Sequence, residues 1–278
     1  MKRSLLLKIL TYLLLTMGAF ISLVPFVFMI STSLKTIGEA LGTQFFPKVP
    51  QWGNYLVAWE RAYFSQYFFN SMKITGITLV GSLSVSILAA YGFARIEFPG
   101  RDLIFGLLLS TMMIPLMVTI IPNFLTVTWL GRIGPLKWIN NWPALTIPFM
   151  GNVFNIFLLR QFFAQIPDEL FDAARIDGSG HLRFLFQVVL PLSKAPLMVI
   201  LVLTFMGSWN SLAWPLLVTN TADWRPISVG LLNFVTEAGQ EFHYIMAGAF
   251  ITIIPVLIIY FFTQRQFTES IARSGLKG

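Results

Sequence analysis

The segment IPDELFDAARIDGSGHLRFLFQVVLPLSKAP extends from Ile166 to Pro196 and carries the most ordered motif of this chain. Pro167 and Asp168 suit the first turn of a helix, because proline tolerates that position and aspartate can cap free amides. Gly178 predicts the end of this helix, since glycine readily adopts the left-handed conformation that closes a helix. The segment therefore predicts a short helix followed by a glycine turn.

A second helix is expected after the glycine turn. Ser179 can cap its start, and Pro191 marks its limit. On the first helix, Asp172 and Arg175 lie three positions apart and can form an ion pair. A helix of about nine residues is marginal alone in water, so we expect it to need a docking surface. An ordinary loop with a helical hairpin is the alternative.

Six windows around this segment contain no Lys, Arg, Asp or Glu: 9–34, 74–94, 103–131, 138–159, 195–222 and 244–264. A helix needs roughly 20 apolar residues to cross the hydrocarbon layer, and in lipid every backbone amide must be paired within its segment. Six such helices in a soluble core would leave too little polar chain to cover the surface, because only 11% of the residues are charged.

The windows predict an all-α integral membrane protein with six transmembrane helices in a single domain over residues 1–278. The predicted spans are roughly 10–32, 72–94, 103–127, 140–161, 196–219 and 244–264. Pro115 and Pro122 should bend the third span. The N-terminus MKRSLLLKIL resembles the start of a signal peptide. However, the apolar sequence that follows is too long and has no small-residue cleavage pattern, so a retained first span is favoured.

The basic residues flank the predicted spans and favour a cytoplasmic location for both termini. The loop 166–191, between spans four and five, is then cytoplasmic as well. The net charge of +7 does not indicate nucleic-acid binding, because the basic residues form no patch with interleaved aromatics. The lipid bilayer is the partner that the composition predicts.

Several kinds of chemistry are excluded by residue type. The sequence has no cysteine, and its two histidines, His181 and His243, fall on predicted opposite sides of the membrane. We therefore expect no catalytic residues and no metal site. No GxxxxGK followed by Ser or Thr is present, so this chain should not bind ATP itself. Without its own energy source, it is either a self-sufficient carrier or channel, or one part of a driven machine.

Polar side chains within the predicted spans are candidates for a solute pathway. Asn152 and Asn155 place amides at membrane depth, where they need a neighbouring helix or a wet cavity; helix packing is the favoured interpretation. A small-residue face in the second span also favours packing, and it consists of Ser82, Ser86, Ala90 and Ala94.

The fifth predicted span combines aromatic rings with hydroxyl and amide groups. Phe205 and Trp209 accompany Ser208 and Asn210 in the sequence TFMGSWN. A sugar has apolar ring faces and polar edges, so such a set of side chains could bind one. Aromatic packing with internal hydrogen bonds is the equally weighted alternative.

The sequence DAARIDG, followed by a helix and LPLSKAP, resembles the cytoplasmic loop of the permease subunits of binding-protein-dependent ABC importers. Asp172 replaces the usual Glu of that motif and keeps its charge on a shorter arm. The resemblance implies that the loop couples to a separate ATPase through Asp172, Ala173, Ala174, Arg175, Asp177, Gly178 and Pro191.

Further short features resemble the carbohydrate branch of these importers, and the chain is similar to the smaller permease of maltose-type transporters. These features are Asn70-Ser71, Trp209-Asn210, Pro215-Leu216 and Gln264-Arg265. The resemblance implies a multi-pass protein of the bacterial inner membrane that translocates a sugar or related solute. It also implies a second permease subunit, an ATPase dimer that grips the loop 168–190 and an extracytoplasmic solute-binding protein. Any ATP and Mg would be bound by the ATPase, with no cofactor on this chain.

Overall fold

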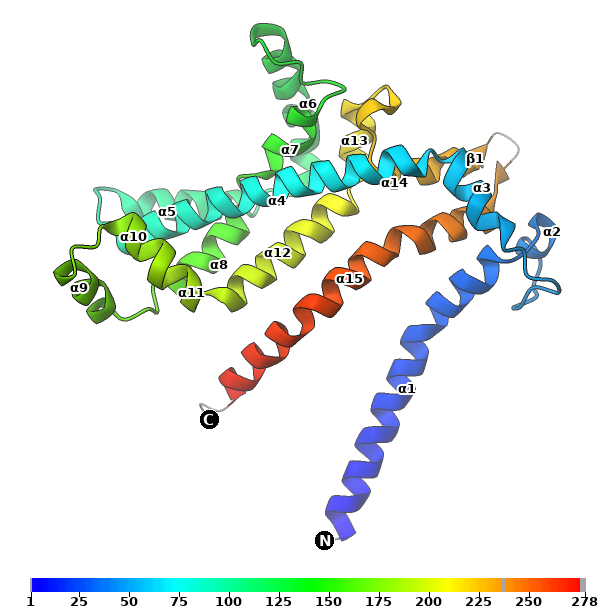
Figure 1. The fold of residues 1–278 in the computed structure, drawn as a ribbon, viewed down its shortest axis with the longest axis horizontal. Helices are drawn as coiled ribbons and strands as arrows, with labels where there is room; N and C mark the ends of the chain where they lie inside the picture. Colours follow the sequence, from blue (N-terminus) through cyan, green and yellow to red (C-terminus); the bar gives the residue numbers. More distant parts are fainter. Residues whose placement is uncertain (1, 237–238, 276–278) are drawn as a thin grey trace. The chain divides into compact units, whose positions relative to one another are not determined.

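The computed structural model describes the backbone of residues 2–236 and 239–275. Helices dominate this part of the chain, and one two-residue antiparallel pair accompanies them (Figure 1). The structure divides into two compact units. The first holds the chain up to Ser65 together with Gly230–Ile254, and the second holds Gln66–Val229 and the chain from Pro255 onward.

The first unit is built around one long N-terminal helix. Its elements are α1 (Lys2–Ser33), α2 (Ile37–Ala40), α3 (Gly53–Arg61), the 3-10 helix η4 (Leu231–Phe234), the strands β1 (Val235–Thr236) and β2 (Gly239–Gln240), and the beginning of α15 (Phe242–Gly275).

The second unit contains the loop 166–191 and the helices around it. Its elements are α4 (Phe64–Arg95, from Gln66), α5 (Arg101–Thr111), α6 (Leu116–Ile133), α7 (Trp142–Thr146), η1 (Ile147–Phe149), α8 (Val153–Phe163), α9 (Asp168–Ile176), α10 (His181–Phe184), the π-helical turn η2 (Leu185–Val189), α11 (Leu190–Leu192), α12 (Lys194–Trp209), α13 (Ala213–Val218), η3 (Ala222–Trp224), α14 (Ile227–Gly230, to Val229) and the end of α15.

Four helices are long and apolar enough to cross a membrane: Leu7–Ser33, Phe64–Arg95, Leu116–Ile133 and Phe242–Gln264. Two further candidates are bent pairs of helices. Trp142–Phe149 and Val153–Phe163 meet at 41°, and His181–Leu192 and Lys194–Trp209 meet at 83°. The described residues therefore provide four to six candidate spans, which agrees with the predicted class of helical membrane protein.

The predicted third span is not one helix. Its first part forms α5, which ends at Thr111, and α6 begins only at Leu116 after Pro115. Proline lacks an amide hydrogen and disfavours the helical conformation of the residue before it, which explains the break. The 11 residues of α5 extend only about 16 Å along a helix axis, too short to cross the membrane alone. Pro122, in contrast, lies within α6.

The predicted fourth and fifth spans are also interrupted. The helix at 142–149 stops before Asn152, which occupies the N-cap of α8. In the fifth span, α12 ends at Trp209 and α13 begins at Ala213. Both interruptions free backbone groups within the predicted spans. Inside a membrane such groups must be buried in protein or line a cavity.

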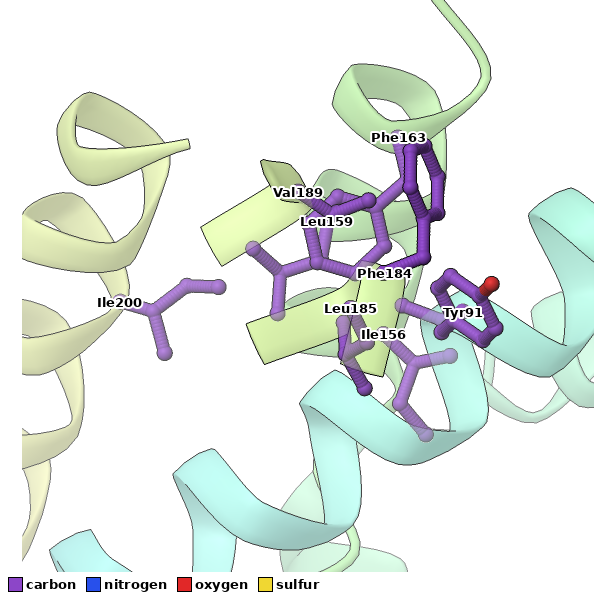
Figure 2. Packing of buried hydrophobic residues seen from close by; sticks show 9 residues of the cluster. Tyr91, Ile156, Leu159, Phe163, Phe184, Leu185, Val189 and Ile200 are labelled. Carbon is purple, nitrogen blue, oxygen red and sulfur yellow. The ribbon is translucent and has the colours of Figure 1, made fainter. Parts of the chain in front are cut away.

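A hydrophobic core in the second unit joins α4, α8, η2 and α12 (Figure 2). Its buried members are Ala90, Tyr91, Ile156, Leu159, Phe163, Phe184, Leu185, Val189 and Ile200. The small-residue face of α4 supports this packing, since Ser82, Ser86 and Ala90 are fully buried and Ala94 packs against the cluster. The packing interpretation of that face is confirmed.

Candidate functional site

The loop 166–191 contains a short helix with a well-defined end. α9 begins at Asp168 after Pro167 and ends at Ile176. Gly178 adopts a φ of 75°, its amide donates to the Arg175 carbonyl at 3.0 Å, and the next amide donates to the Ala174 carbonyl at 2.8 Å. This pair of hydrogen bonds is the Schellman motif. The predicted glycine end of the helix is therefore confirmed.

The surface of α9 is open, because none of its residues is buried. Among the predicted coupling residues, Ala174 is half-buried against the core. The exposed ones are Asp172, Ala173, Arg175, Asp177, Gly178 and Pro191. The sequence prediction missed Ile176, whose side chain is 87% exposed at the end of α9. An apolar residue two positions before the glycine, among charged neighbours, was the available signal.

The predicted ion pair on α9 is absent from the described structure. The Arg175 guanidinium lies over the Phe171 ring at 5.8 Å instead of pairing with Asp172. An exposed ion pair contributes little free energy, so a cation–π contact can compete with it. The neighbouring carboxylate of Asp168 does not cap the helix either, because it contacts the Arg95 side chain.

The second helix of the loop also differs from its predicted bounds. It begins at His181 with Gly180 at the N-cap, and no side chain caps it; the expected cap by Ser179 is wrong. Gly180 carries no side chain, so this start leaves no capping oxygen. The helix contains the π turn η2 and ends at Leu192, one residue after Pro191, which is close to the predicted limit.

A cavity of about 410 Å³ lies within the second unit. It is lined by residues from α4, α6, α8, α12 and the interruptions around α7 and α13. The polar side chains at its surface are Ser71, Thr78, Asn123, Asn152, Asn155, Thr204, Ser208 and Ser211, and the aromatic ones are Phe149, Phe154 and Trp214.

The two asparagines of the predicted fourth span both line this cavity, but in different ways. Asn155 is 2% exposed and donates to the hydroxyls of Ser82, at 3.2 Å, and Thr204, at 3.1 Å. Its amide group is thus occupied by helix packing. Asn152 is exposed, and its side-chain oxygen accepts a hydrogen bond from the backbone N–H of Asn155 at 3.1 Å.

Of the four residues predicted from the fifth span, only Ser208 lines the cavity; it donates to the Thr75 hydroxyl at 3.2 Å. Phe205 and Trp209 stack at a centroid distance of 5.5 Å and an interplanar angle of 12°, and both are buried. Asn210 donates back to the Met206 carbonyl at 3.0 Å. These three side chains therefore lie outside the cavity lining.

The sequence prediction missed Thr78, which lines the cavity from α4. Its side chain is 2% exposed, and its hydroxyl has no hydrogen-bond partner in the described structure. A buried hydroxyl without a partner is costly, which makes Thr78 the clearest polar group available to a ligand. The signal was a polar face on the second predicted span, formed at helical spacing by Ser71, Thr75, Thr78 and Ser82.

No group of three or more metal-ligating side chains occurs within the described ranges of the chain. The site therefore consists of two parts. One is an exposed, rigidly terminated helix on a loop between interrupted spans, and the other is a polar cavity within the helices.

The model of one protein family, the binding-protein-dependent transport system inner membrane component, matches residues 82–272. This range covers most of the chain and includes α9 and most of the cavity helices. The chain belongs to this family and is a membrane subunit of an ABC importer in the inner membrane. The family predicted from the loop motif is confirmed.

Individual relatives agree with this assignment. The chain is 36% identical over 213 residues to the sn-glycerol-3-phosphate transport system permease protein UgpE of Yersinia enterocolitica, covering 76% of this chain and 74% of the relative. It is 35% identical over 231 residues to the UgpE protein of Pectobacterium atrosepticum, covering 80% of each.

Among solved structures, the chain is similar to one from a bacterial ABC transporter involved in the import of the acidic polysaccharide alginate. The TM-score is 0.80 at 26% sequence identity, over 94% of this chain and 96% of the other. A second alginate transporter structure, in complex with a periplasmic protein that holds an alginate pentasaccharide, matches with a TM-score of 0.66 at 14% identity. This second likeness shows the fold alone.

Proposed function

We propose that this subunit couples solute import to a separate ATPase dimer that binds ATP and Mg and docks on the loop 168–190. The observation that carries the proposal is the open surface of α9, a helix too short to be stable alone and yet closed by a Schellman motif. The proposed docking surface consists of Asp172, Ala173, Ala174, Arg175, Ile176, Asp177, Gly178 and Pro191.

In this proposal, ATP binding closes the ATPase dimer and moves α9, so that the solute pathway opens outward; hydrolysis resets it. A nucleotide can drive such a change only by binding one of the two transporter states better than the other. This subunit then needs no ATP site and no cofactor of its own. It is one half of the pathway, and a second permease subunit supplies the other half.

The proposed topology has six spans and both termini in the cytoplasm. The bent pair Trp142–Phe149 and Val153–Phe163 forms the fourth span, and α12 with α13 forms the fifth, so that His181–Leu192 stays in the cytoplasmic loop. The distribution of basic residues supports this orientation. It places the loop 166–191 on the side where the ATPase has access to ATP. An extracytoplasmic binding protein would deliver the solute from the opposite side, which the name of the family supports.

The proposed solute is a sugar or a related polyhydroxyl compound. Two relatives are named for sn-glycerol 3-phosphate, and a similar solved structure belongs to an importer of the acidic polysaccharide alginate. Both compounds combine hydroxyl groups with acidic groups. The cavity offers neutral donors and acceptors, among them Thr78, Asn123 and Asn152, beside the Trp214 ring. Such a mixture suits a solute with polar edges and an apolar face.

A mild-detergent purification of this chain from its native membrane tests the proposal. We expect an ATPase and a second permease to co-purify, and the ATPase to be lost when residues 172–178 are replaced by a Gly/Ser sequence of equal length. Recovery of the chain alone, with solute movement in vesicles that contain no ATP, would contradict the proposal and favour a self-sufficient carrier.

A further inference from the structure

The cytoplasmic loop is attached to α4 by one buried arginine. Arg95 is the last residue of α4, and its side chain is only 7% exposed. Its Nε donates to the Phe163 carbonyl at 3.0 Å, and its two terminal nitrogens donate to the Ile166 carbonyl and to the Asp168 carboxylate. Every one of these acceptors lies at or beside the junction between α8 and α9.

The three acceptors of Arg95 explain why this position carries a guanidinium. Phe163 is the last residue of α8, and a carbonyl at a helix end has no partner within its own helix. Asp168 is the first residue of α9. A guanidinium presents several donors in a fixed fork, whereas a lysine presents a single point charge. Arg95 therefore connects the ends of α4 and α8 with the start of α9.

Tyr91 makes a second connection from the same face of α4, one helical turn before Arg95. Its side chain is 4% exposed, and its hydroxyl lies 2.9 Å from Nδ1 of His181. The His181 ring stacks on Phe171 of α9 at 4.9 Å. The start and the middle of α9 are thus both supported from α4, directly by Arg95 and through His181 by Tyr91.

The other end of the same helix lines the cavity. Ser71, Ile74 and Thr78 of α4 contribute to the cavity surface, and α4 continues without a break to Arg95 (Figure 1). Thr78 lies roughly 25 Å from Arg95 along the helix axis, at 1.5 Å per residue. α8 and α12 also reach the cavity, through Asn155 and Ser208. However, the loop joins α12 across an 83° bend after Leu192, and α8 is interrupted beside the cavity, at Asn152.

We infer that α4 transmits the movement of α9 to the cavity. Arg95 and Tyr91 are the positioning residues that connect α4 to α9. An unbroken helix transmits a displacement along its length, whereas a sharp bend, such as the one of 83° between Leu192 and Lys194, absorbs part of it. This inference rests on the proposed function, since it requires that an ATPase moves α9. It adds that the force reaches the cavity through side-chain contacts and not only through the covalent chain.

The absence of cysteine from the sequence allows a direct test by spin labelling. Labels are placed at Val80→Cys on α4 and Met117→Cys on α6, both exposed positions, in the assembled importer with its ATPase. The distance between the labels is measured without nucleotide and with ATP and vanadate. We expect ATP to shift this distance in the otherwise unchanged protein.

In Arg95→Ala we expect the ATPase to remain bound and to hydrolyse ATP, while the population with the shifted distance falls about tenfold, within the usual range of coupling effects. Arg95→Lys should restore part of the shift, because its charge can reach only some of the acceptors. Asp168→Asn should have a smaller effect than Arg95→Ala, since the two carbonyl acceptors remain. If Arg95 only stabilised the fold, Arg95→Ala would reduce ATP hydrolysis and the distance shift together, and would not lower the shift alone.

Arg101→Ala is the matched control. Arg101 is the first residue of α5, just after the turn that follows α4, and in the described part of the chain its ion pair is with the adjacent Asp102, at 3.4 Å. It should leave the shift unchanged. If Arg95→Ala does not fold, Tyr91→Phe is the variant that tests the inference, since it keeps the buried ring and removes only the bond to His181. A reduced distance shift in Tyr91→Phe supports the proposed connection between α4 and α9. An unchanged shift in the folded variants overturns the role of α4 and leaves the proposed function standing. No ATP-dependent shift in the unsubstituted complex overturns both.

Discussion

Asn155 on α8 donates a hydrogen bond to the hydroxyl of Ser82 on α4 at 3.2 Å, although 73 residues separate the two in the chain. The same amide group donates to Thr204 on α12. One asparagine thus holds three helices together beside the cavity. These hydrogen bonds explain why the Asn155 side-chain amide is tolerated within a predicted span: both of its partners are neutral hydroxyls of neighbouring helices.

Replacing Asn155 with Ala should destabilise the helix packing by about 1 kcal/mol, the usual size of an interhelical hydrogen-bond effect in membrane proteins. The hydroxyls of Ser82 and Thr204 would lose a partner. Unfolding in mixed detergent micelles, followed by circular dichroism, measures the effect. Asn210→Ala is the control, because that side chain is exposed and bonds only within its own helix. Equal stability of the two variants would argue against the three-helix role of Asn155.

Gly178→Ala should reduce transport coupling while leaving membrane insertion intact. At a φ of 75° a side chain costs about 1 kcal/mol or more, and the backbone would relax by breaking the Schellman end of α9. Gly178→Asn should be milder, since asparagine tolerates this conformation. The measurement is the ATP hydrolysed per solute imported by reconstituted importer.

Gly180→Ala provides the matched control for this prediction. Gly180 has a φ of −83°, and a Cβ there would meet nothing within 4 Å. This variant should behave like the unsubstituted protein. If Gly178→Ala and Gly180→Ala were equally well coupled, the geometry of the α9 end would not matter for function.

Gly81→Ala should destabilise the second unit by about 1 kcal/mol through overpacking. An added Cβ would lie 2.5 Å from the Met150 sulfur and 2.7 Å from its Cγ, so the Met150 side chain must move. Met150 follows η1, beside the interruption that precedes α8. Shortening it should relieve the clash, and the double variant Gly81→Ala/Met150→Ala should recover much of the lost thermal stability.

Gly76→Ala is the corresponding control on α4, because no atom lies within 4 Å of its added Cβ. Alanine forms helix better than glycine, so this variant should melt at the same temperature or higher. A Gly81→Ala protein as stable as Gly76→Ala would mean that Met150 does not press on α4.

Acid should loosen the loop after α1 through Glu39. Hydrogen bonds from the backbone amides of Thr36 and Lys48 lower the pKa of the Glu39 carboxyl below 4.5. Because the pKa of Glu39 is lower in the folded loop than in the unfolded chain, the ionised carboxylate stabilises the folded loop at pH values above the ordinary pKa. This stabilisation is lost as the pH falls through the lowered pKa. The protection of the backbone amides of residues 36–48, corrected for the intrinsic exchange rate at each pH, should therefore fall below pH 4.5.

The same experiment with Glu39→Gln separates this effect from general acid unfolding. The amide does not titrate, so the protection of residues 36–48 should no longer depend on pH in this range. A pH dependence that survives the substitution would assign the acid sensitivity to other groups.

The sequence alone determined the class of membrane protein and the family. A charge-free window of 20 residues or more is long enough to cross the membrane, and its backbone amides can be hydrogen-bonded in lipid only if it forms a helix. The segment DAARIDG carries the motif of the family, and its glycine is needed for the conformation of the adjoining backbone. The turn at Gly178 could be predicted because a left-handed residue depends on neighbouring backbone atoms and not on distant packing. Family membership followed from the same stretch and is borne out by the match over residues 82–272.

Only the tertiary structure decided which polar residues face the cavity. Phe205, Ser208, Trp209 and Asn210 are adjacent in the sequence, yet only Ser208 reaches the cavity, since successive residues of a helix point in different directions. Likewise, Arg95 reads as an ordinary positive residue at the end of a span. Its acceptors at Phe163, Ile166 and Asp168 come from a distant part of the chain, and contacts at such separation exist only once the helices have packed.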